Sequence, residues 1–492
     1  MRSQPKIYEL HAPAWLHRQA RRIGRPLTLA TVPDEVWSEL ADLGFGLVWV
    51  MGVWKRSPAS RALALTSPAR QQWQQIVPDL GDDDILGSPY AIHDYSIAPG
   101  LGDEGEIAKL RAQLNRLGLR LVLDFVPNHL GCDHPWVTTH PWRLLRGSDR
   151  EVVEHPDWFF GGPGGAHFAH GRDPNFPPWR DTVQVDYTNA DARAALAGEL
   201  ARIAELADGI RIDLAMLGLN RVVARTWGEL LPVGGPAQAE LWSELVARAR
   251  KRCPSTLLIA EAYWGLEPDL LELGFDFAYD KTIYDLLLAD RLGALRAHLG
   301  SARSWLARGV HFVENHDEER AQVAFGRERA RAATVVMLTL PGMPMIHDGQ
   351  LEGAALRAPI HLARAAAADE LPDEGRFQRE MLELTRAAAF TRGTWSLLHA
   401  VEEPPRASSE SPILAWRWRA DEEVVAVAVN WSAEPVAATI ELRQDDLHAP
   451  GERNVIDLAT HAPRGAIAEM ATLRVELGPW EHCILALPTS GA

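Results

Sequence analysis

Short apolar runs alternate with amphipathic segments along most of the chain. The runs are rich in β-branched and aromatic residues and occupy residues 6–12, 46–53, 119–126, 209–215, 256–263, 275–280, 310–315 and 343–348. Between them lie segments such as 32–44, 104–118 and 189–207, whose apolar residues recur at helical spacing. Near-continuous apolar strands that alternate with helices are typical of a parallel sheet covered on both faces. Eight such units in a stretch of roughly 390 residues predict an α/β fold of the (β/α)8 TIM-barrel type.

A doubly wound open sheet is the alternative α/β architecture. It is disfavoured because no glycine-rich G-x-G-x-x-G turn follows the first apolar run.

Two stretches depart from the barrel pattern. Residues 131–183, between the third and fourth predicted strands, are rich in His, Trp, Pro and Gly, and a loop of that length in a compact domain is usually functional. From about residue 395 the sequence changes to alternating strands, which predicts a C-terminal antiparallel β-sandwich over 395–492. We therefore expect the barrel at 1–130 and 184–394, an inserted domain at 131–183, and a linker just after residues 390–395.

Composition excludes some classes of protein. The formal net charge of -16 argues against a nucleic-acid partner, because such proteins normally carry a basic face. No signal peptide and no run of eighteen apolar residues is found, so we expect neither secretion nor a membrane span. Cys132, Cys253 and Cys483 match no metal spacing, and so sparse a set is typical of free thiols in the cytoplasm. The oligomeric state is not indicated.

Charged residues stand at the ends of four predicted strands. Arg211 and Asp213 interrupt an otherwise apolar run, Asp124 and Glu261 close two others, and Asp317 follows a fourth. One acid at a strand end is more often a helix cap than a catalyst. Four together favour a site, because barrel active sites form at the carboxyl ends of the strands.

Glycoside hydrolysis with retention fits this set of residues. It needs a carboxylate nucleophile and a protonated acid about 5–5.5 Å apart. Since Arg211 and Asp213 share one face of a strand, Arg211 is expected to lower the pKa of Asp213 and keep it ionised. Glu261 has apolar and aromatic neighbours, Tyr263 and Trp264 among them, which suits an acid of raised pKa. The third carboxylate can stabilise positive charge in the transition state.

Four motifs are similar to those of a known family. They read DFVPNH (124–129), GIRIDLA (209–215), IAEA (259–262) and FVENHD (312–317). In this order they resemble the signature regions of the α-amylase family of retaining glycoside hydrolases and transglycosylases. Further similarities lie at residues 41–50, 87–102, 183–187 and 341–353, so the resemblance covers nearly the whole chain.

The resemblance implies roles for individual residues. Asp213 would be the nucleophile, Glu261 the general acid/base and Asp317 the transition-state stabiliser. With the strand-end residues, the expected substrate-binding set is Tyr90, Asp94, Asp124, His129, Arg211, Tyr263, Trp264 and His316. Within it, Tyr90 would stack on the sugar, the two histidines would bind hydroxyls and Asp94 would support a loop. Asn128 matches a position that ligates a structural Ca²⁺ in many members, and no organic cofactor is implied.

The chain also departs from the family pattern. Many starch-degrading members have Lys-His on the acceptor side where this chain has Met216 and Leu217, which cannot donate hydrogen bonds to a glucan. The insertion has no cluster of Asp residues that would make a calcium site evident. Residues 132–142 resemble segments of some glucan-transferring relatives. The apolar pair and the Trp-rich loops favour a transferase or an enzyme of small oligosaccharides.

Two other functions stay open at this point. One is a catalytically inactive, amylase-like binding protein, although all three acids, Arg211 and both histidines are present. The other is a barrel enzyme of unrelated chemistry, such as a metal-dependent hydrolase. It is disfavoured because His11 stands alone on the first strand, without an H-x-H pair.

Overall fold

Eight parallel strands close into a barrel in the computed structural model, which describes residues 4–228, 230–231, 239–365, 370–404, 411–421, 423–442, 454–466 and 472–487. Around the barrel the order is β1-β15-β14-β13-β12-β11-β5-β2. The strands are β1 (Ile7–His11), β2 (Leu47–Met51), β5 (Arg120–Phe125), β11 (Gly209–Ile212), β12 (Leu257–Ala260), β13 (Phe277–Tyr279), β14 (Gly309–His311) and β15 (Met343–His347). Each coincides with or overlaps one of the predicted apolar runs, so the TIM-barrel prediction is confirmed.

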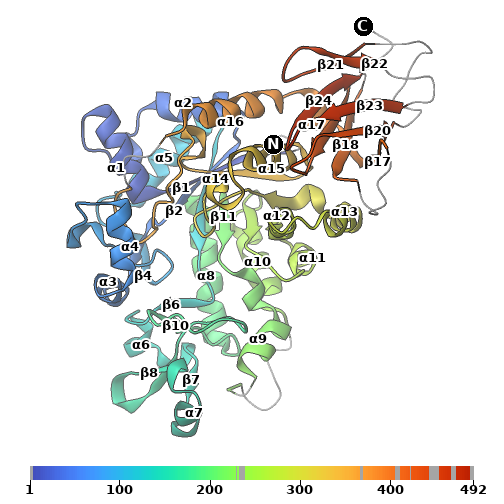
Figure 1. Ribbon diagram of the computed structural model, residues 1–492. Coiled ribbons are helices and arrows are strands. Elements are labelled where there is room, and N and C mark those ends of the chain that lie inside the picture. The colour runs from blue at the N-terminus through green and yellow to red at the C-terminus, as the bar shows by residue number, and fades with distance from the viewer. Residues whose placement is uncertain are drawn as a thin grey trace.

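Helices surround the barrel (Figure 1). They include α1 (Ala12–Ile23), α2 (Asp34–Asp42), α5 (Glu104–Arg116), α8 (Ala190–Leu206), α9 (Asn220–Trp227), α10 (Leu241–Arg252), α11 (Glu267–Glu272), α12 (Lys281–Leu288), α13 (Leu292–Ser301), α15 (Arg327–Thr339) and α16 (Pro372–Leu384). Side-chain caps start two of them: Asp103 accepts from the backbone N–H of Glu106, and Asn189 accepts from those of Asp191 and Ala192.

Two short helices extend the loop that follows β2. They are α3 (Pro58–Leu65) and α4 (Ala69–Ile76), and they lie between β3 (Trp54–Arg56) and β4 (Ile92–Ile97). Trp73 of α4 packs in a small separate core with Ala64, Val77, Leu80, Ile85 and Leu362. Because Leu362 belongs to the segment after β15, this unit joins two loops at the carboxyl end of the barrel.

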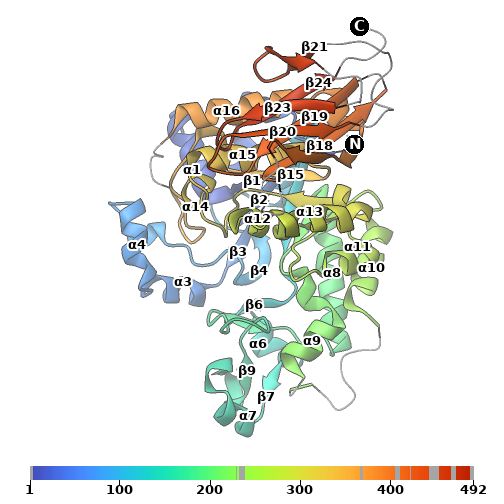
Figure 2. The same ribbon diagram turned by 45° about the vertical axis from the view of Figure 1, so that its right-hand side comes forward.

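The segment after β5 projects from that same end of the barrel. Its base is the antiparallel pair β6 (His129–Gly131) and β10 (Thr182–Gln184). It also holds a three-stranded sheet of β7 (Arg146–Gly147), β9 (His167–Ala169) and β8 (Phe159–Gly161), together with α6 (Trp136–Thr139) and α7 (Asp149–Glu154). Figures 1 and 2 place this segment at the far end of the molecule from the C-terminal strands.

The C-terminal strands form two antiparallel sheets, as the sequence predicts. One sheet contains β16 (Thr394–Leu397), β18 (Ile413–Ala420), β19 (Glu423–Asn430), β24 (His482–Leu487), β21 (Asn454–Asp457) and β22 (Pro463–Ala466). The other contains β17 (His399–Glu402), β20 (Val436–Glu441) and β23 (Thr472–Leu477). The predicted linker is wrong: the stretch after 390–395 is occupied by β16 and β17, and Gly393 alone separates β16 from α17 (Ala388–Arg392).

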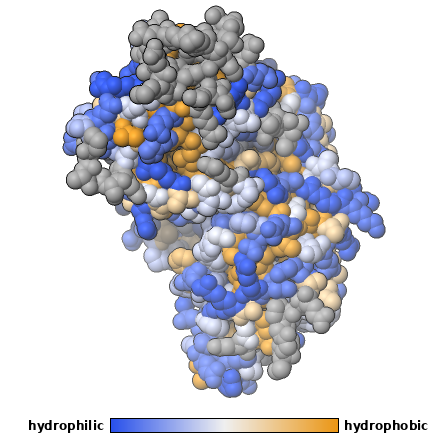
Figure 3. Space-filling model, turned by 90° about the vertical axis from the view of Figure 1, so that its right-hand side faces the viewer, coloured by the Kyte–Doolittle hydropathy of each residue, from blue (hydrophilic) through white to orange (hydrophobic). Residues whose placement is uncertain are grey.

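Hydrophobic residues at the surface form separate patches among hydrophilic ones on the face drawn in Figure 3. Among the described residues, no helix has the length and apolar character needed to cross a membrane.

Candidate active site

Arg211 lies at the centre of a group of buried carboxylates at the mouth of the barrel. Its Nη1 atom is 2.8 Å from Asp213 Oδ1, and its Nη2 atom is 2.8 Å from Glu261 Oε2. Asp124 Oδ1 is 3.6 Å from Nη1. All four side chains are almost completely buried, so their charges interact in a medium that screens them weakly.

The barrel register brings these residues together. Arg211 of β11 pairs with Asp124 of β5 on one side and with Ile259 of β12 on the other. Asp213 and Glu261 both come directly after their strands. Because β5, β11 and β12 are neighbours, their last residues meet at one place, as the sequence predicts.

Aromatic rings surround the guanidinium of Arg211. The ring centroids of Trp49, Tyr90 and Tyr279 lie 4.9, 5.4 and 5.6 Å from its central carbon, distances typical of cation–π contacts. Sequence reasoning found Tyr90 but missed Trp49 of β2 and Tyr279 of β13. Both lie inside apolar runs, where an aromatic residue is indistinguishable from ordinary core.

His316 forms a second buried group with Glu9 and Tyr90. Its Nδ1 atom is 2.5 Å from Glu9 Oε1, and its Nε2 atom is 2.9 Å from the Tyr90 hydroxyl. Burial disfavours the protonated ring, but the charges of Asp317 and Glu9 outweigh it and raise the pKa of His316 to about 9. Glu9 was missed, although a charge inside the apolar run 6–12 is the same signal that identified Arg211.

The pKa of Asp213 moves opposite to the expectation. Burial and the negative charge of Glu261 raise it to about 8, even though Arg211 works in the lowering direction. Burial likewise raises the pKa of Asp124 to about 6, against the effect of Arg211. One guanidinium therefore does not neutralise three buried carboxylates, and the pKa of Asp213 stays above its ordinary value.

Glu261 has more donors than Asp213. The Tyr263 hydroxyl donates to Oε1 at 2.6 Å, and the backbone N–H of Leu214 donates to Oε2 at 2.6 Å. Leu214 has a left-handed backbone with φ of 41°, which turns its N–H toward Glu261. Trp264 also has a positive φ, 66°, and its side chain is 42% exposed.

Asp317 stands apart from the buried group. Its side chain is 49% exposed, and Oδ2 lies 3.2 Å from His316 Nε2. The loop that carries it is held by Asn315, whose Oδ1 atom accepts from the N–H groups of Asp317 and Glu318 at 2.8 Å each. Asp317 can thus approach a bound molecule from the solvent side of His316.

The sequence of this chain is similar to those of known proteins. Residues 38–272 match the model of the alpha-amylase catalytic domain. Over these residues, just under half of the chain, the sequence is similar to the catalytic domain of the α-amylase family. It is 27% identical to alpha-amylase MalA of Haloarcula japonica over 282 residues, which cover 54% of this chain and 37% of that protein. It is 25% identical to alpha-1,4-glucan:maltose-1-phosphate maltosyltransferase 1 of Streptomyces coelicolor over 363 residues, which cover 71% of this chain and 45% of that protein. The chain thus spans less than half the length of either relative.

Solved α-amylase structures share the whole fold. The noncanonic maltogenic alpha-amylase AmyB of Thermotoga neapolitana superposes with a TM-score of 0.65 at 18% identity, over 99% of both chains. An alpha-amylase of Lactobacillus plantarum gives a TM-score of 0.67 at 18% identity, again over 99% of both chains. The overall fold is therefore common to these chains.

Other residues predicted from the α-amylase resemblance lie around this centre. His129 is buried, with its ring centroid 4.9 Å from that of Trp179, and burial lowers its pKa to about 3, so its ring is neutral. Asp94 of β4 accepts from Lys55 of β3 and from the N–H of Ser96, both at 2.9 Å. It therefore ties together the two strands whose connection carries Tyr90.

The surroundings of Asn128 do not fit a calcium ion. Its side-chain oxygen accepts from Gln184 Nε2 at 3.1 Å, so an amide donor takes the place that a cation needs. Within the described residues, no three His, Cys, Asp or Glu side chains gather to hold a metal. In this arrangement Asn128 does not offer its side-chain oxygen to a cation, and calcium binding by the chain as a whole stays a prediction.

Met216 and Leu217 do not line an acceptor site. Both are buried, 1% and 3% exposed, in the 3₁₀ turn Ala215–Gly218. Because both side chains lie in the core, their apolar character carries no information about the acceptor.

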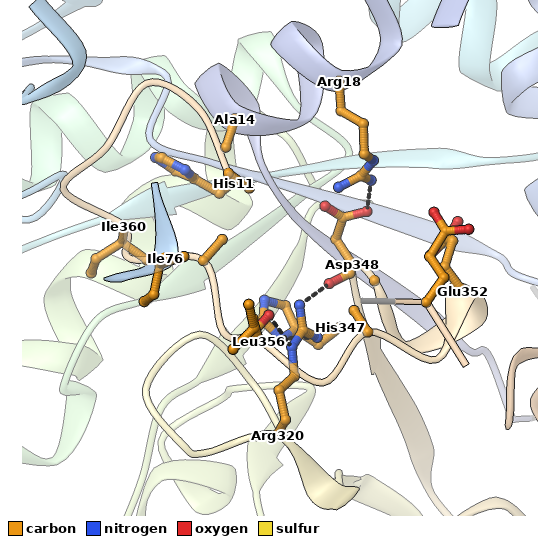
Figure 4. Close-up of a pocket in the computed structure, with 15 residues that line it drawn as sticks. His11, Ala14, Arg18, Ile76, Arg320, His347, Asp348, Glu352, Leu356 and Ile360 are labelled. Atoms are coloured by element: carbon orange, nitrogen blue, oxygen red, sulfur yellow. Dashed lines mark hydrogen bonds and ion pairs between the residues drawn. The ribbon is translucent and has the colours of Figure 1, made fainter. Parts of the chain in front are cut away.

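A small cavity lies beside the mouth, between β1, β15 and the segment after β15 (Figure 4). Arg18 pairs with Asp348, and Arg320 pairs with Glu314 and donates to the Asp348 carbonyl at 2.9 Å. The cavity volume is about 40 Å³. That suffices for one or two water molecules but not for a sugar ring.

Proposed function

We propose that this chain is a retaining enzyme that cleaves α-glucosidic bonds of α-glucans or small α-glucosides and transfers the glycosyl unit to water or to another sugar. The observation that carries the proposal is the contact of one buried guanidinium, Arg211, with both Asp213 and Glu261. A nucleophile and an acid/base close together are what retention requires.

The proposed reaction uses the three acids in turn. The Asp213 carboxylate attacks the anomeric carbon while Glu261 gives its proton to the departing glycosidic oxygen, leaving a glycosyl ester on Asp213. Glu261, now ionised, takes a proton from water or a sugar hydroxyl, which attacks the anomeric carbon, breaks its bond to the Asp213 oxygen and releases the Asp213 carboxylate. The exposed carboxylate of Asp317 stabilises the positive charge of both transition states.

The neighbouring residues are assigned to the sugar. His316 is protonated at neutral pH through Glu9 and Asp317, so it donates to a hydroxyl. Neutral His129 and the ring of Tyr90 complete the contacts of the same sugar unit. Trp264, exposed just beyond Glu261, offers a face for the next unit.

Whether water or a sugar is the preferred acceptor is the open part of the proposal. The names of the relatives include both hydrolases and a transferase, and the buried Met216 and Leu217 no longer favour either. Incubation with glycogen, maltooligosaccharides, sucrose and trehalose tests this: smaller products alone indicate hydrolysis, and longer ones indicate transfer.

The nucleophile is tested by trapping the glycosyl ester. We expect a 5-fluoro-α-glucosyl fluoride to add one sugar mass to the peptide that contains Asp213. Asp213→Asn should abolish labelling and lower kcat by about 10⁴-fold or more, whereas the control Asp285→Asn, at an exposed position of α12, should behave like the wild type. Unchanged turnover in Asp213→Asn would instead favour the inactive binding protein or other chemistry for this site.

We also propose a cytoplasmic location. It is supported by the three cysteines, none of which is in a disulfide. Fractionation of the native cells tests it, and recovery of the protein outside the cytoplasm would contradict it.

A further inference from the structure

Two loops are joined to each other at the mouth of the barrel, on the side that faces Glu261. In the closed strand order β1 lies opposite β12, and the neighbours of β1 are β2 and β15. The loop after β2 carries α3 and α4, and the segment after β15 pairs with it. Ile85 forms a bridge with Leu362, and the Leu86 N–H donates to the His361 carbonyl at 2.8 Å. We name these two loops, residues 58–88 and 354–365, the end wall.

Charged and aromatic contacts hold the end wall together. Arg364 binds both carboxylate oxygens of Asp84, at 2.6 and 2.9 Å, and one oxygen of Asp79 at 2.8 Å. Trp73 of α4 stacks on His361 with 5.3 Å between the ring centroids. Hydrogen bonds to charged groups are stronger than those between neutral ones, so this junction is a fixed part of the mouth.

Both ends of the wall are attached to parts of the candidate site. Arg357 donates to the backbone carbonyl of Asp317. At the other end Ser60 Oγ donates to Asp181 Oδ2, next to β10, at 2.6 Å. The wall also leads directly into Tyr90, which follows it in the chain. It therefore borders the mouth from the Asp317 loop to the base of the insertion.

The space between the end wall and β1 is too small for a sugar. His11 of β1, Ile76 of α4 and Ile360 line the cavity that Figure 4 shows there. Its volume of about 40 Å³ holds one or two water molecules. Within the described part of the chain, this cavity offers a glucan no way past the wall.

The proposed reaction sets the direction of a substrate relative to the wall. Glu261 protonates the departing oxygen, so the departing, reducing-end part of the substrate lies on the β12 side, where Trp264 is 42% exposed. The part retained on Asp213 carries the non-reducing end. Further units attached to it continue away from Glu261, toward the end wall.

We propose that the end wall makes this enzyme exo-acting, so that it takes a glucan by its non-reducing end and transfers a short glycosyl unit of fixed length. This inference rests on the function proposed above and names its substrate class. Chains with a free non-reducing end are accepted, and the interior of a long or cyclic glucan is excluded by a clash with the wall. The distance from Asp213 to the wall sets the length of the unit.

Maltoheptaose with a blocked non-reducing end tests the proposal on the wild type. We expect kcat/KM for the 4,6-O-ethylidene derivative to be lower than for free maltoheptaose by about 100-fold or more, because the enlarged end displaces the scissile bond. At early times the same number of units should be removed from maltopentaose and from maltoheptaose. β-Cyclodextrin, which has no chain end, should stay intact.

Two variants connect that result to the wall itself. Arg364→Ala removes the bonds to Asp84 and Asp79, and Trp73→Ala removes the stacking on His361. Each should favour local opening of the junction. The ratio of kcat/KM for the blocked substrate to that for the free one should then rise by roughly 10-fold.

Arg379→Ala is the matched control. It also removes an arginine that joins two elements, since Arg379 of α16 donates to Glu39 of α2 at 2.7 Å. That contact lies outside the end wall, so the ratio of the two kcat/KM values should stay at the wild-type value.

Several results would overturn the inference. Equal kcat/KM for free and blocked maltoheptaose, or different numbers of units removed from the two chains, would show that the wall does not limit the substrate. A wild-type ratio in both Arg364→Ala and Trp73→Ala would show that another part excludes the blocked end. A wild type that cleaves no α-glucoside would remove the proposed function, and the inference with it; an active wild type that cleaves the blocked chain equally well would remove the inference alone.

Discussion

At the scale of single residues, the site is a balance of buried charges. Arg211 contacts Asp213, Glu261 and Asp124, and Glu9 pairs with His316 in a neighbouring group. Burying a charge is costly unless it is paired, so such a set is kept where the charges are needed. The pairing keeps a positive charge on His316, which the proposed chemistry uses to bind a sugar hydroxyl.

Glu9→Gln should alter the pH dependence of stability. His316 has a folded-state pKa of about 9 against an ordinary value of 6.5. A raised pKa contributes stability that is complete below the unfolded value and is lost as pH rises through the folded one. Without the Glu9 charge the pKa of His316 falls, so the loss of stability between pH 6 and about 9.5 should shrink by roughly 1–3 kcal/mol. Urea unfolding at both pH values measures this.

The comparison with wild type removes contributions common to both proteins, and Asp124, whose pKa the Glu9 charge also raises, adds a smaller change in the same direction. Asp213 also has a raised pKa, so its contribution to stability is lost over an overlapping pH range. It titrates in both proteins, and its contribution cancels to first order. Glu35→Gln, on the exposed side of α2, removes the same charge without touching His316 and should keep the wild-type pH dependence. An equal loss of stability in Glu9→Gln and wild type would mean that Glu9 does not hold the proton on His316.

At the scale of elements, strand ends were predictable and turns were not. Period-two alternation and the rule that barrel sites form at carboxyl ends were enough to find Asp124, Arg211, Asp213 and Glu261. The same reasoning applied to residues 6–12 would have found Glu9. The burial of Met216 could not be predicted, because the turn before it depends on a contact between Leu214 and Glu261, which are distant in sequence. The net direction of the Asp213 pKa likewise depends on distances that no pattern encodes.

The close approach of Gly171 to the β6–β10 pair offers a test at this scale. Gly171 lies so close to β6 that a Cβ atom placed there would be 2.7 Å from His129 Cβ and 2.7 Å from Thr182 Oγ1. Gly171→Ala should therefore displace His129, destabilise the protein by about 1–3 kcal/mol and lower kcat/KM by roughly 10- to 100-fold. Gly161→Ala in the same insertion, where a Cβ meets nothing within 4 Å, is the control. Unchanged kcat/KM in Gly171→Ala would argue that His129 has no part in binding.

At the scale of the whole molecule, the barrel and the larger C-terminal sheet share one hydrophobic core. Trp416 and Trp418 of β18 and Val427 of β19 belong to the same buried cluster as the barrel strands and helices. The Trp418 indole N–H donates to the Thr339 carbonyl of α15 at 2.6 Å. A second core fills the space between the two sheets. The sheet next to the barrel is thus buried on both faces. Figure 2 shows the C-terminal strands beside the barrel.

This shared core predicts that barrel and sandwich unfold together. Trp418→Ala should cost about 3–5 kcal/mol, through lost packing and the orphaned carbonyl of Thr339. Calorimetry should show one transition at a lower Tm, and activity on maltooligosaccharides should be lost at that same temperature, although Trp418 is remote from the site. Phe176→Ala, whose side chain is 66% exposed, should leave the Tm nearly unchanged. Two resolved transitions, with activity surviving the first, would mean that the sandwich is an independent unit and that its core does not stabilise the barrel.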